Sequence, residues 1–182
     1  DFTPGFWGKR WKEALIIPLL AFALYWMCLP YGYVLDDQIV ITDNKFTQKG
    51  VDGIWEILST ESFTGYFGGQ KDLVAGARYR PLSIVTFAVE QTVFGDNTFI
   101  RHFINILLYG LCGLLIFRIF SILLPEKQNT PWLLSIPFLA VVLYILHPVH
   151  SEVVANLTGS DAIMSTIGAL GAVSFALRFL PT

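Results

Sequence analysis

A segment rich in metal-ligating and acid–base side chains lies between two apolar runs in the last third of the chain. It begins His147-Pro148-Val149-His150-Ser151-Glu152, and Asp161 follows nine residues after Glu152. Ionisable side chains at a membrane boundary are costly to retain unless something uses them. We therefore treat His147, His150, Glu152 and Asp161 as candidate site residues. Asp161 also begins the last apolar run, where an acidic side chain is suited to cap a helix.

The two histidines of this segment have two interpretations. The pattern His147-x-x-His150-x-Glu152 contains the residue types of a metal site. However, Pro148 breaks the helical spacing of the histidines, and the zinc-protease pattern His-Glu-x-x-His is absent. A divalent cation held by His147, His150 and Glu152 and a polar site for sugar or acceptor both stay open.

A second acidic pair, Asp36 and Asp37, directly follows the first apolar run. Such acids can simply be solvated at the end of a helix. Alternatively, one of the carboxylates is a general base for a hydroxyl group or helps to hold a cation. This pair is the candidate for catalysis, and a single site requires that it lies on the same side of a membrane as the 147–161 segment.

Arg78 and Arg80 stand immediately before a proline-initiated apolar stretch. Arginine presents a planar fork of donors that fits a phosphate or pyrophosphate. Basic side chains also reach the lipid headgroups without any such role. Both interpretations are kept, and the two arginines are candidate ligands for a donor phosphate.

Arg101, His102 and Asn105 open a long apolar run, and their spacing of three and four residues lets them share helix faces. Polar side chains in this position often join membrane helices to one another. In the alternative interpretation, Arg101 is a third ligand for phosphate, and His102 and Asn105 contact the sugar or the acceptor.

The composition points to lipid as the solvent. The chain has 182 residues, of which 54% are hydrophobic and 14% charged, whereas soluble domains have about 25% charged residues. The aromatic share of 15% fits belts of Trp and Tyr at membrane interfaces. A net charge of −2 without a basic stripe or a glycine-rich phosphate loop gives no indication of nucleic-acid binding. Because the chain begins at Asp1 and ends directly after an apolar run, we expect a piece of a longer polytopic protein.

The hydropathy pattern predicts an all-α polytopic membrane protein. We expect about four transmembrane helices at about 14–35, 99–124, 132–146 and 162–180, with outer loops at 36–98 and 147–161. A short amphipathic helix on the membrane surface is expected at 51–59. The apolar stretch 81–94 is too short to cross the bilayer comfortably and suits an interfacial or re-entrant helix.

Charges flanking these runs indicate the topology. Lys9, Arg10 and Lys12 place the N-terminus in the cytoplasm by the positive-inside rule. If 82–94 does not cross, Arg118 and Lys127 are also cytoplasmic, and both acidic segments face outward. If 82–94 does cross, Arg118, Lys127 and every later loop lie on the opposite side of the membrane. The positive-inside rule favours the first arrangement.

Several short blocks together resemble a known family. In order along the chain they are Leu35-Asp36-Asp37, Ile41-Thr42-Asp43-Asn44, Phe63-Thr64-Gly65-Tyr66-Phe67-Gly68-Gly69, Tyr79-Arg80-Pro81-Leu82, His102-Phe103-Ile104-Asn105 and His147-Pro148-Val149-His150-Ser151-Glu152-Val153-Val154-Ala155. Their order is similar to the N-terminal part of the transmembrane, tetratricopeptide-repeat-containing O-mannosyltransferases and their bacterial relatives. The resemblance covers about 33–180 and places the chain in the GT-C glycosyltransferase superfamily.

The resemblance implies a partial GT-C core with juxtamembrane helices in a large catalytic first outer loop, and it implies further membrane helices and tetratricopeptide repeats downstream. It implies that a sugar on a polyprenyl phosphate is moved to a hydroxyl, expected to be a Ser or Thr of an acceptor protein. One departure concerns phosphate binding. Where the family usually has Gly-Arg next to the acid of its second loop, this chain has Gly159-Ser160-Asp161.

We therefore expect an inverting glycosyltransferase in the bacterial inner membrane or the endoplasmic reticulum membrane, with its active face outward or lumenal. Asp36 or Asp37 would be the base. The alternative is a non-catalytic membrane subunit, or a truncated GT-C-like fragment, that packs against other membrane subunits in a larger complex. The two differ in whether the intact protein transfers sugar from a polyprenyl-phosphate donor.

Overall fold

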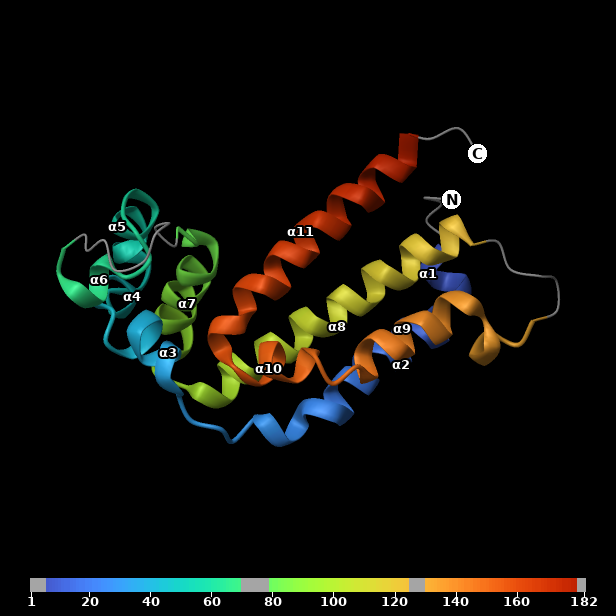
Figure 1. The fold of residues 1–182 in the computed structure, drawn as a ribbon, viewed down its shortest axis with the longest axis horizontal. Helices are drawn as coiled ribbons and strands as arrows, with labels where there is room; N and C mark the ends of the chain where they lie inside the picture. Colours follow the sequence, from blue (N-terminus) through green and yellow to red (C-terminus); the bar gives the residue numbers. More distant parts are fainter. Residues whose placement is uncertain (1–5, 70–78, 125–129, 180–182) are drawn as a thin grey trace.

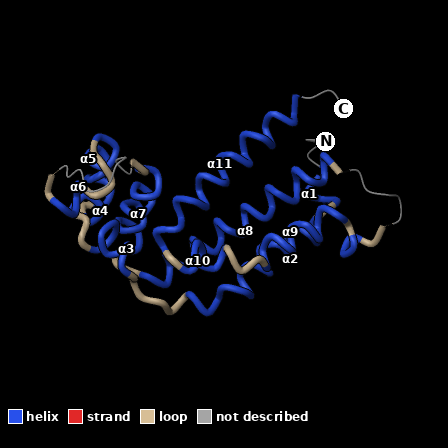
Figure 2. Tube along the Cα trace, viewed as in Figure 1, coloured by secondary structure: helices blue, strands red, loops and turns tan. Residues whose placement is uncertain are grey.

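Helices make up all the regular structure in the described part of the chain. The computed structural model describes residues 6–69, 79–124 and 130–179, and Figure 2 shows helices joined by short loops throughout these ranges. The prediction of an all-helical chain is therefore confirmed for these ranges.

Three helices, α2, α9 and α11, pack around α8 and form a bundle with it (Figure 1). The bounds of the four helices are α2 (Trp11–Tyr25), α8 (Thr98–Leu123), α9 (Ile136–Leu146) and α11 (Ser160–Ala176). The short helices α1 (Phe6–Lys9), η1 (Trp26–Cys28), η4 (Trp132–Leu134) and η6 (Leu177–Phe179) flank them. Helices α2 and α9 pack against one side of α8, and α11 lies along the other side in Figure 1.

Two glycines of α8 allow the close packing of this bundle. A Cβ atom on Gly110 would lie 3.2 Å from Cα of Pro18, and one on Gly113 would lie 2.9 Å from Cγ2 of Ile17. Small residues let membrane helices approach closely and gain van der Waals contact along their length. The core of the bundle is formed by Ile17, Ala21, Ile106, Phe117, Val141, Ile145 and their neighbours.

Within the described ranges, two segments are long and apolar enough to cross a membrane by length and composition, Trp11–Cys28 and Thr98–Leu123. The first helix ends earlier than the predicted 14–35, since α2 ends at Tyr25 and the short helix η1 that follows it ends at Cys28. Helix α9 has 11 residues and rises only about 16 Å. The count of about four membrane crossings therefore stays a prediction.

The described parts of the first loop fold into a small helical unit, the loop module (residues 35–69 and 79–94), on the left of Figure 1. Its elements are α3 (Leu35–Asp37), η2 (Gln38–Thr42), α4 (Lys45–Gln48), η3 (Gly50–Gly53), α5 (Ile54–Ser59), α6 (Thr64–Phe67) and α7 (Pro81–Phe94). Val40, Ile41, Ile57, Ile84, Phe87 and Ala88 form its own apolar core, together with Leu157 from the second loop. The second loop thus takes part in the folding of the first.

Two residues of the family-like blocks hold the loop module together. The side-chain oxygen of buried Asn44 accepts hydrogen bonds from the backbone N–H groups of Phe46 (3.0 Å) and Thr47 (3.3 Å), which caps α4. Its amide nitrogen donates to the Ser62 carbonyl at 3.1 Å. A Cβ on Gly65 would lie 2.0 Å from Oδ1 of Asn44, so a side chain at Gly65 would displace this cap.

Helix α7 packs against α4, α5 and η3 within the loop module. Its 14 residues rise about 21 Å, which is less than the hydrocarbon core of about 30 Å. This length agrees with the prediction that 81–94 does not cross the bilayer, although its position in a membrane stays a prediction.

Arg101 joins α7 to the first turn of α8. Its guanidinium donates to the Gln91 side chain (2.7 Å), to the Glu90 carboxylate (3.3 Å) and to the Phe87 carbonyl (3.3 Å). Arg101 is 2% exposed and Glu90 is 8% exposed. The hydroxyl of Tyr33 donates to Asp96 in the α7–α8 turn. This joint fixes the angle at which the loop module meets the bundle.

We expect the stability of the protein to depend on the protonation of Glu90. Burial raises the pKa of Glu90 from 4.5 to about 7, although Arg101 acts in the opposite direction. A raised pKa in the folded state means that the bound proton stabilises the fold fully below the unfolded pKa of 4.5, and that this contribution is lost as the pH rises through about 7. The midpoint temperature of thermal unfolding in detergent should therefore decrease as the pH is raised from 5 to about 8.

The control is Glu90→Gln, which keeps the shape of the side chain without a titrating group. Its midpoint should show less of this decline over the same pH range. An identical decline in wild type and Glu90→Gln would contradict the assignment.

Candidate functional site

A cavity of about 240 Å³, here called the loop cavity, lies between the loop module and the second loop. Three separate parts of the chain line it. The lining residues are Asp36, Val40, Ser62, Phe63, Arg80, Ser83, Ile84, Phe87, Glu152, Val153, Asn156, Thr158, Gly159, Asp161 and Ala162. The structure therefore brings Asp36, Arg80, Glu152 and Asp161 together, although they are far apart in sequence.

The two neighbouring aspartates lie in different surroundings. Asp36 is exposed and lines the loop cavity. Asp37 is fully buried, with 0% of its surface exposed. Its two carboxylate oxygens accept hydrogen bonds from the backbone N–H groups of Thr158 (2.9 Å) and Val34 (3.1 Å). Asp36 can therefore touch a bound molecule, whereas Asp37 ties the start of the loop module to the second loop.

Burial raises the pKa of Asp37 above its ordinary value of 3.8. The N–H groups of Val34 and Thr158 oppose this effect, and so does the nearby His102. These donors offset part of the free-energy cost of a carboxylate that has lost its water.

Arg80 and Asp161 form an ion pair at the edge of the loop cavity, between Nη1 of Arg80 and Oδ2 of Asp161. The side chain of Arg80 is 54% exposed and that of Asp161 is 18% exposed. The backbone N–H of Arg80 donates to Oγ of Ser62 at 3.0 Å, and Pro81 then starts α7. Arg78, the other candidate of this segment, lies outside the described residues.

The polar residues of α8 face other parts of the protein. Arg101 is held in the α7–α8 joint and does not line the loop cavity. Asn105 donates to the carbonyl of Val154 at 2.8 Å, so it anchors α10 (His150–Ala155) and the following η5 (Leu157–Gly159). His102 is 1% exposed, and its ring lies edge-on to Tyr31. The structure thus separates Arg101, His102 and Asn105 from the cavity that the sequence assigned to them.

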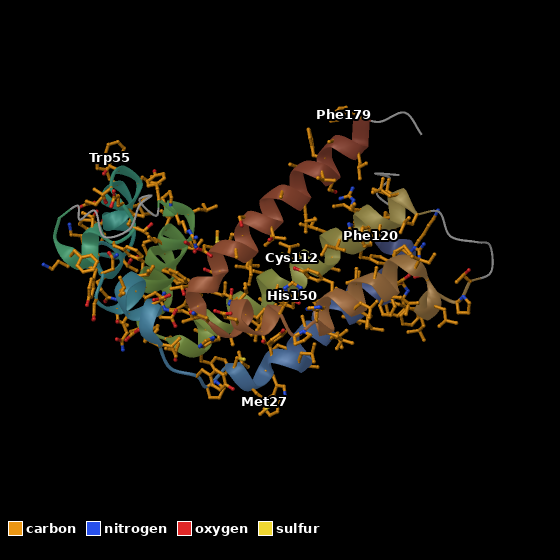
Figure 3. All side chains as sticks on the ribbon, viewed as in Figure 1. Met27, Trp55, Cys112, Phe120, His150 and Phe179 are labelled. Carbon is orange, nitrogen blue, oxygen red and sulfur yellow. The ribbon has the colours of Figure 1, made fainter. Side chains whose placement is uncertain are left out.

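The two histidines of the second loop also lie away from the loop cavity. His147 ends α9 and His150 begins α10, because Pro148 turns the chain between them. Figure 3 shows His150 beside the middle of α8, and its ring lies 4.4 Å from the ring of Tyr144. Burial lowers the pKa of His150, and the neighbouring His147 lowers it further.

These positions bear on the open question of a metal. Both histidines line an apolar hollow of about 560 Å³ between α8, α9 and α11, whereas Glu152 lines the loop cavity. Among the described residues, no group of three His, Cys, Asp or Glu side chains is arranged to hold a metal ion. The two histidines and Glu152 therefore lie in different hollows of the described structure.

Sequence reasoning missed three residues that shape the cavity, Ser62, Asn156 and Thr158. The Asn156 side chain accepts from the backbone N–H (3.1 Å) and the hydroxyl (2.8 Å) of Thr158. This local turn presents the Thr158 N–H to Asp37. An Asn-x-Thr sequence after a short helix is a turn signal, but it does not identify the distant carboxylate that completes the contact.

Comparisons with known proteins agree with the resemblance seen in the motifs. The chain is 28% identical over 164 residues to protein O-mannosyl-transferase F38B6.6 of Caenorhabditis elegans, covering 89% of this chain and 22% of the relative. It is 25% identical over 162 residues to human protein O-mannosyl-transferase TMTC3, covering 88% of this chain and 16% of the relative. It is 27% identical over 188 residues to mouse protein O-mannosyl-transferase TMTC4, covering 97% of this chain and 23% of the relative.

The chain thus spans about a fifth of the length of these curated relatives. No family model matches the chain, and no solved structure does. The similarity to protein O-mannosyl-transferases, which the order of the short blocks indicated, is confirmed.

We expect Asp37→Asn to destabilise the fold. An amide offers one acceptor oxygen and one NH₂ group, so either Val34 or Thr158 loses its acceptor. An unsatisfied buried donor costs about 1–3 kcal/mol. Thermal unfolding in detergent should show a lower midpoint than wild type. The matched control is Asp52→Asn, at an exposed position of η3, which should change stability by less than about 0.5 kcal/mol. Equal midpoints for both variants would contradict the role of Asp37.

Proposed function

We propose that this chain carries the catalytic loops of a membrane glycosyltransferase that moves a sugar from a polyprenyl phosphate to a Ser or Thr hydroxyl of a protein. The observation that carries the proposal is the loop cavity, where an exposed carboxylate and an arginine face the same space. The relatives are protein O-mannosyl-transferases, and mannose is the sugar that we propose.

Asp36 is the proposed base, because it is exposed at the cavity while Asp37 is buried. The proton of the acceptor hydroxyl passes to the Asp36 carboxylate as the hydroxyl oxygen bonds to the anomeric carbon. The bond between that carbon and the phosphate oxygen breaks, and its electron pair leaves with the lipid phosphate. Attack from the face opposite the leaving group inverts the configuration at that carbon.

Arg80 is the proposed ligand of the leaving phosphate. Its guanidinium is half exposed at the cavity edge and carries a fixed positive charge. A cation placed where negative charge develops lowers the barrier more than it strengthens ground-state binding. Glu152 and Asp161 line the same cavity and are proposed to accept hydrogen bonds from sugar hydroxyls.

The position of the site relative to the hydrocarbon core of the membrane can be inferred from the length of α8. Its 26 residues rise about 39 Å, which exceeds a hydrocarbon core of about 30 Å. The buried polar residues Arg101, His102 and Asn105 all lie in its first two to three turns. We propose that this end of α8 stands above the hydrocarbon core, inside the loop module and on the outer side of the membrane.

We expect both loops to be labelled from the same side of the membrane. Lys45→Cys and Ser151→Cys place thiols at exposed positions of the loop module and the second loop, whereas the native Cys28 and Cys112 are buried. An impermeant maleimide applied to sealed vesicles should modify both new thiols or neither, according to vesicle orientation. Modification of the two from opposite sides would rule out a shared site.

We expect Asp36→Asn to lower sugar transfer by roughly 10²- to 10⁴-fold, since the amide cannot take the proton. Folding should be unaffected, because Asp36 is exposed. The measurement is transfer from a polyprenyl-phosphate sugar to a Ser/Thr peptide, with the intact protein in membranes. The control is Asp52→Asn, which lies outside the loop cavity and should transfer at the wild-type rate.

Two results would overturn this assignment. Wild-type transfer by Asp36→Asn would show that Asp36 is not the base. Absence of transfer by the unmutated intact protein with polyprenyl-phosphate donors would favour the alternative of a non-catalytic membrane subunit.

A further inference from the structure

The Arg80–Asp161 ion pair stands where two hollows meet. One is the loop cavity, and the other is a groove of about 390 Å³ between the start of α7 and the start of α11, here called the α7–α11 groove. Arg80, Ser83, Asp161 and Ala162 line both spaces. The remaining described residues of the groove are Pro81, Leu82, Met164 and Ser165.

The two spaces differ in charge. Asp36, Glu152 and Asp161 bring three carboxylates to the loop cavity, and Arg80 is its only basic residue in the described ranges. Among the described residues that line the groove, Arg80 and Asp161 are the only charged ones. An anion would be repelled by the carboxylates of the loop cavity, whereas sugar hydroxyls would donate to them. A phosphate therefore fits best at Arg80 on the groove side.

Asp161 already pairs with the positive charge of Arg80 to which such a phosphate would bind. Its Oδ2 accepts from Nη1 of Arg80, and the Arg80 side chain remains 54% exposed. Ion pairs with this degree of exposure contribute little to stability because water screens them. The donor phosphate is a diester with one negative charge, as a carboxylate has, and its two free oxygens accept two parallel hydrogen bonds from a guanidinium, whereas the contact of Asp161 is made through Oδ2. The phosphate is thus able to displace Asp161.

We propose that Asp161 masks a lipid-phosphate site on Arg80. The phosphate exchanges with the Asp161 carboxylate, and the first units of the apolar chain lie in the α7–α11 groove against Leu82 and Met164. Displacement of Asp161 joins the groove to the loop cavity, where the sugar meets Asp36. The inference rests on the proposed function for the identity of the donor, and its test needs no transfer.

The experiment is equilibrium binding of a sugar-free polyprenyl phosphate to the intact protein in detergent. Asp161→Asn should tighten binding by roughly two- to fivefold, which corresponds to the free energy of an exposed ion pair. Arg80→Gln should weaken binding by about tenfold or more, because a charge-assisted hydrogen bond is lost. The double variant Arg80→Gln/Asp161→Asn should bind like Arg80→Gln alone, since Asp161 acts through Arg80.

The double variant separates masking from general repulsion. If Asp161 only repels anions, its removal tightens binding equally with Gln at position 80, and the proposal fails. The proposal also fails if Asp161→Asn leaves binding unchanged or weakens it. The variant Asp161→Ala repeats this comparison with a second side chain. Inorganic phosphate should bind more weakly than the lipid. Equal affinity for both would overturn the assignment of the groove.

The test is independent of catalysis. If these affinities hold while the intact protein transfers no sugar, the masked site stands and the proposed function fails. If the protein transfers sugar while the affinities do not follow this pattern, the masked site fails and the proposed function stands.

Discussion

The carboxylate of Asp37 is the contact on which the candidate site depends. It accepts one backbone hydrogen bond from each of two segments that are far apart in sequence, the extended residue Val34 and the turn at Thr158. The loop module and the second loop also meet through side-chain packing around Leu157 and through the half-exposed Arg80–Asp161 ion pair. A buried charge with two backbone donors has a single favourable geometry, because any shift leaves a donor unpaired. The walls of the loop cavity therefore have a fixed separation.

Helix α8 is the second constraint, since it belongs to both halves of the molecule. Its later turns pack against α2 and α9 through Gly110 and Gly113. Its first turns carry Arg101 and Asn105, which hold α7 and α10 respectively. Polar side chains at the end of an apolar helix thus serve to attach loops, and the resulting joints are internal rather than exposed to a substrate.

The sequence predicted the parts of the site that depend on loop chemistry. Asp36, Arg80, Glu152 and Asp161 do line one cavity, and a helix of 14 residues does begin at Pro81. The sequence could not separate Asp36 from Asp37, because only the packing of the second loop decides which of two adjacent carboxylates is buried. It also could not show which way Arg101 points, since a polar residue at the start of an apolar helix can face a site or a neighbouring helix. The spacing of His147 and His150 did not show their position, since both line the apolar hollow and the ring of His150 packs against Tyr144.

The bond from Thr158 to Asp37 spans 121 positions of the chain, and this separation has a consequence for biosynthesis. At roughly 5–20 residues per second, the ribosome needs about 6 to 24 seconds to supply Thr158 after Asp37 has been made. During that interval the loop module lacks both its polar partner and the apolar side chain of Leu157. The first loop therefore has an incomplete core until the second loop has been made. The nascent chain would therefore need a chaperone most in the time between the synthesis of the first loop and that of the second.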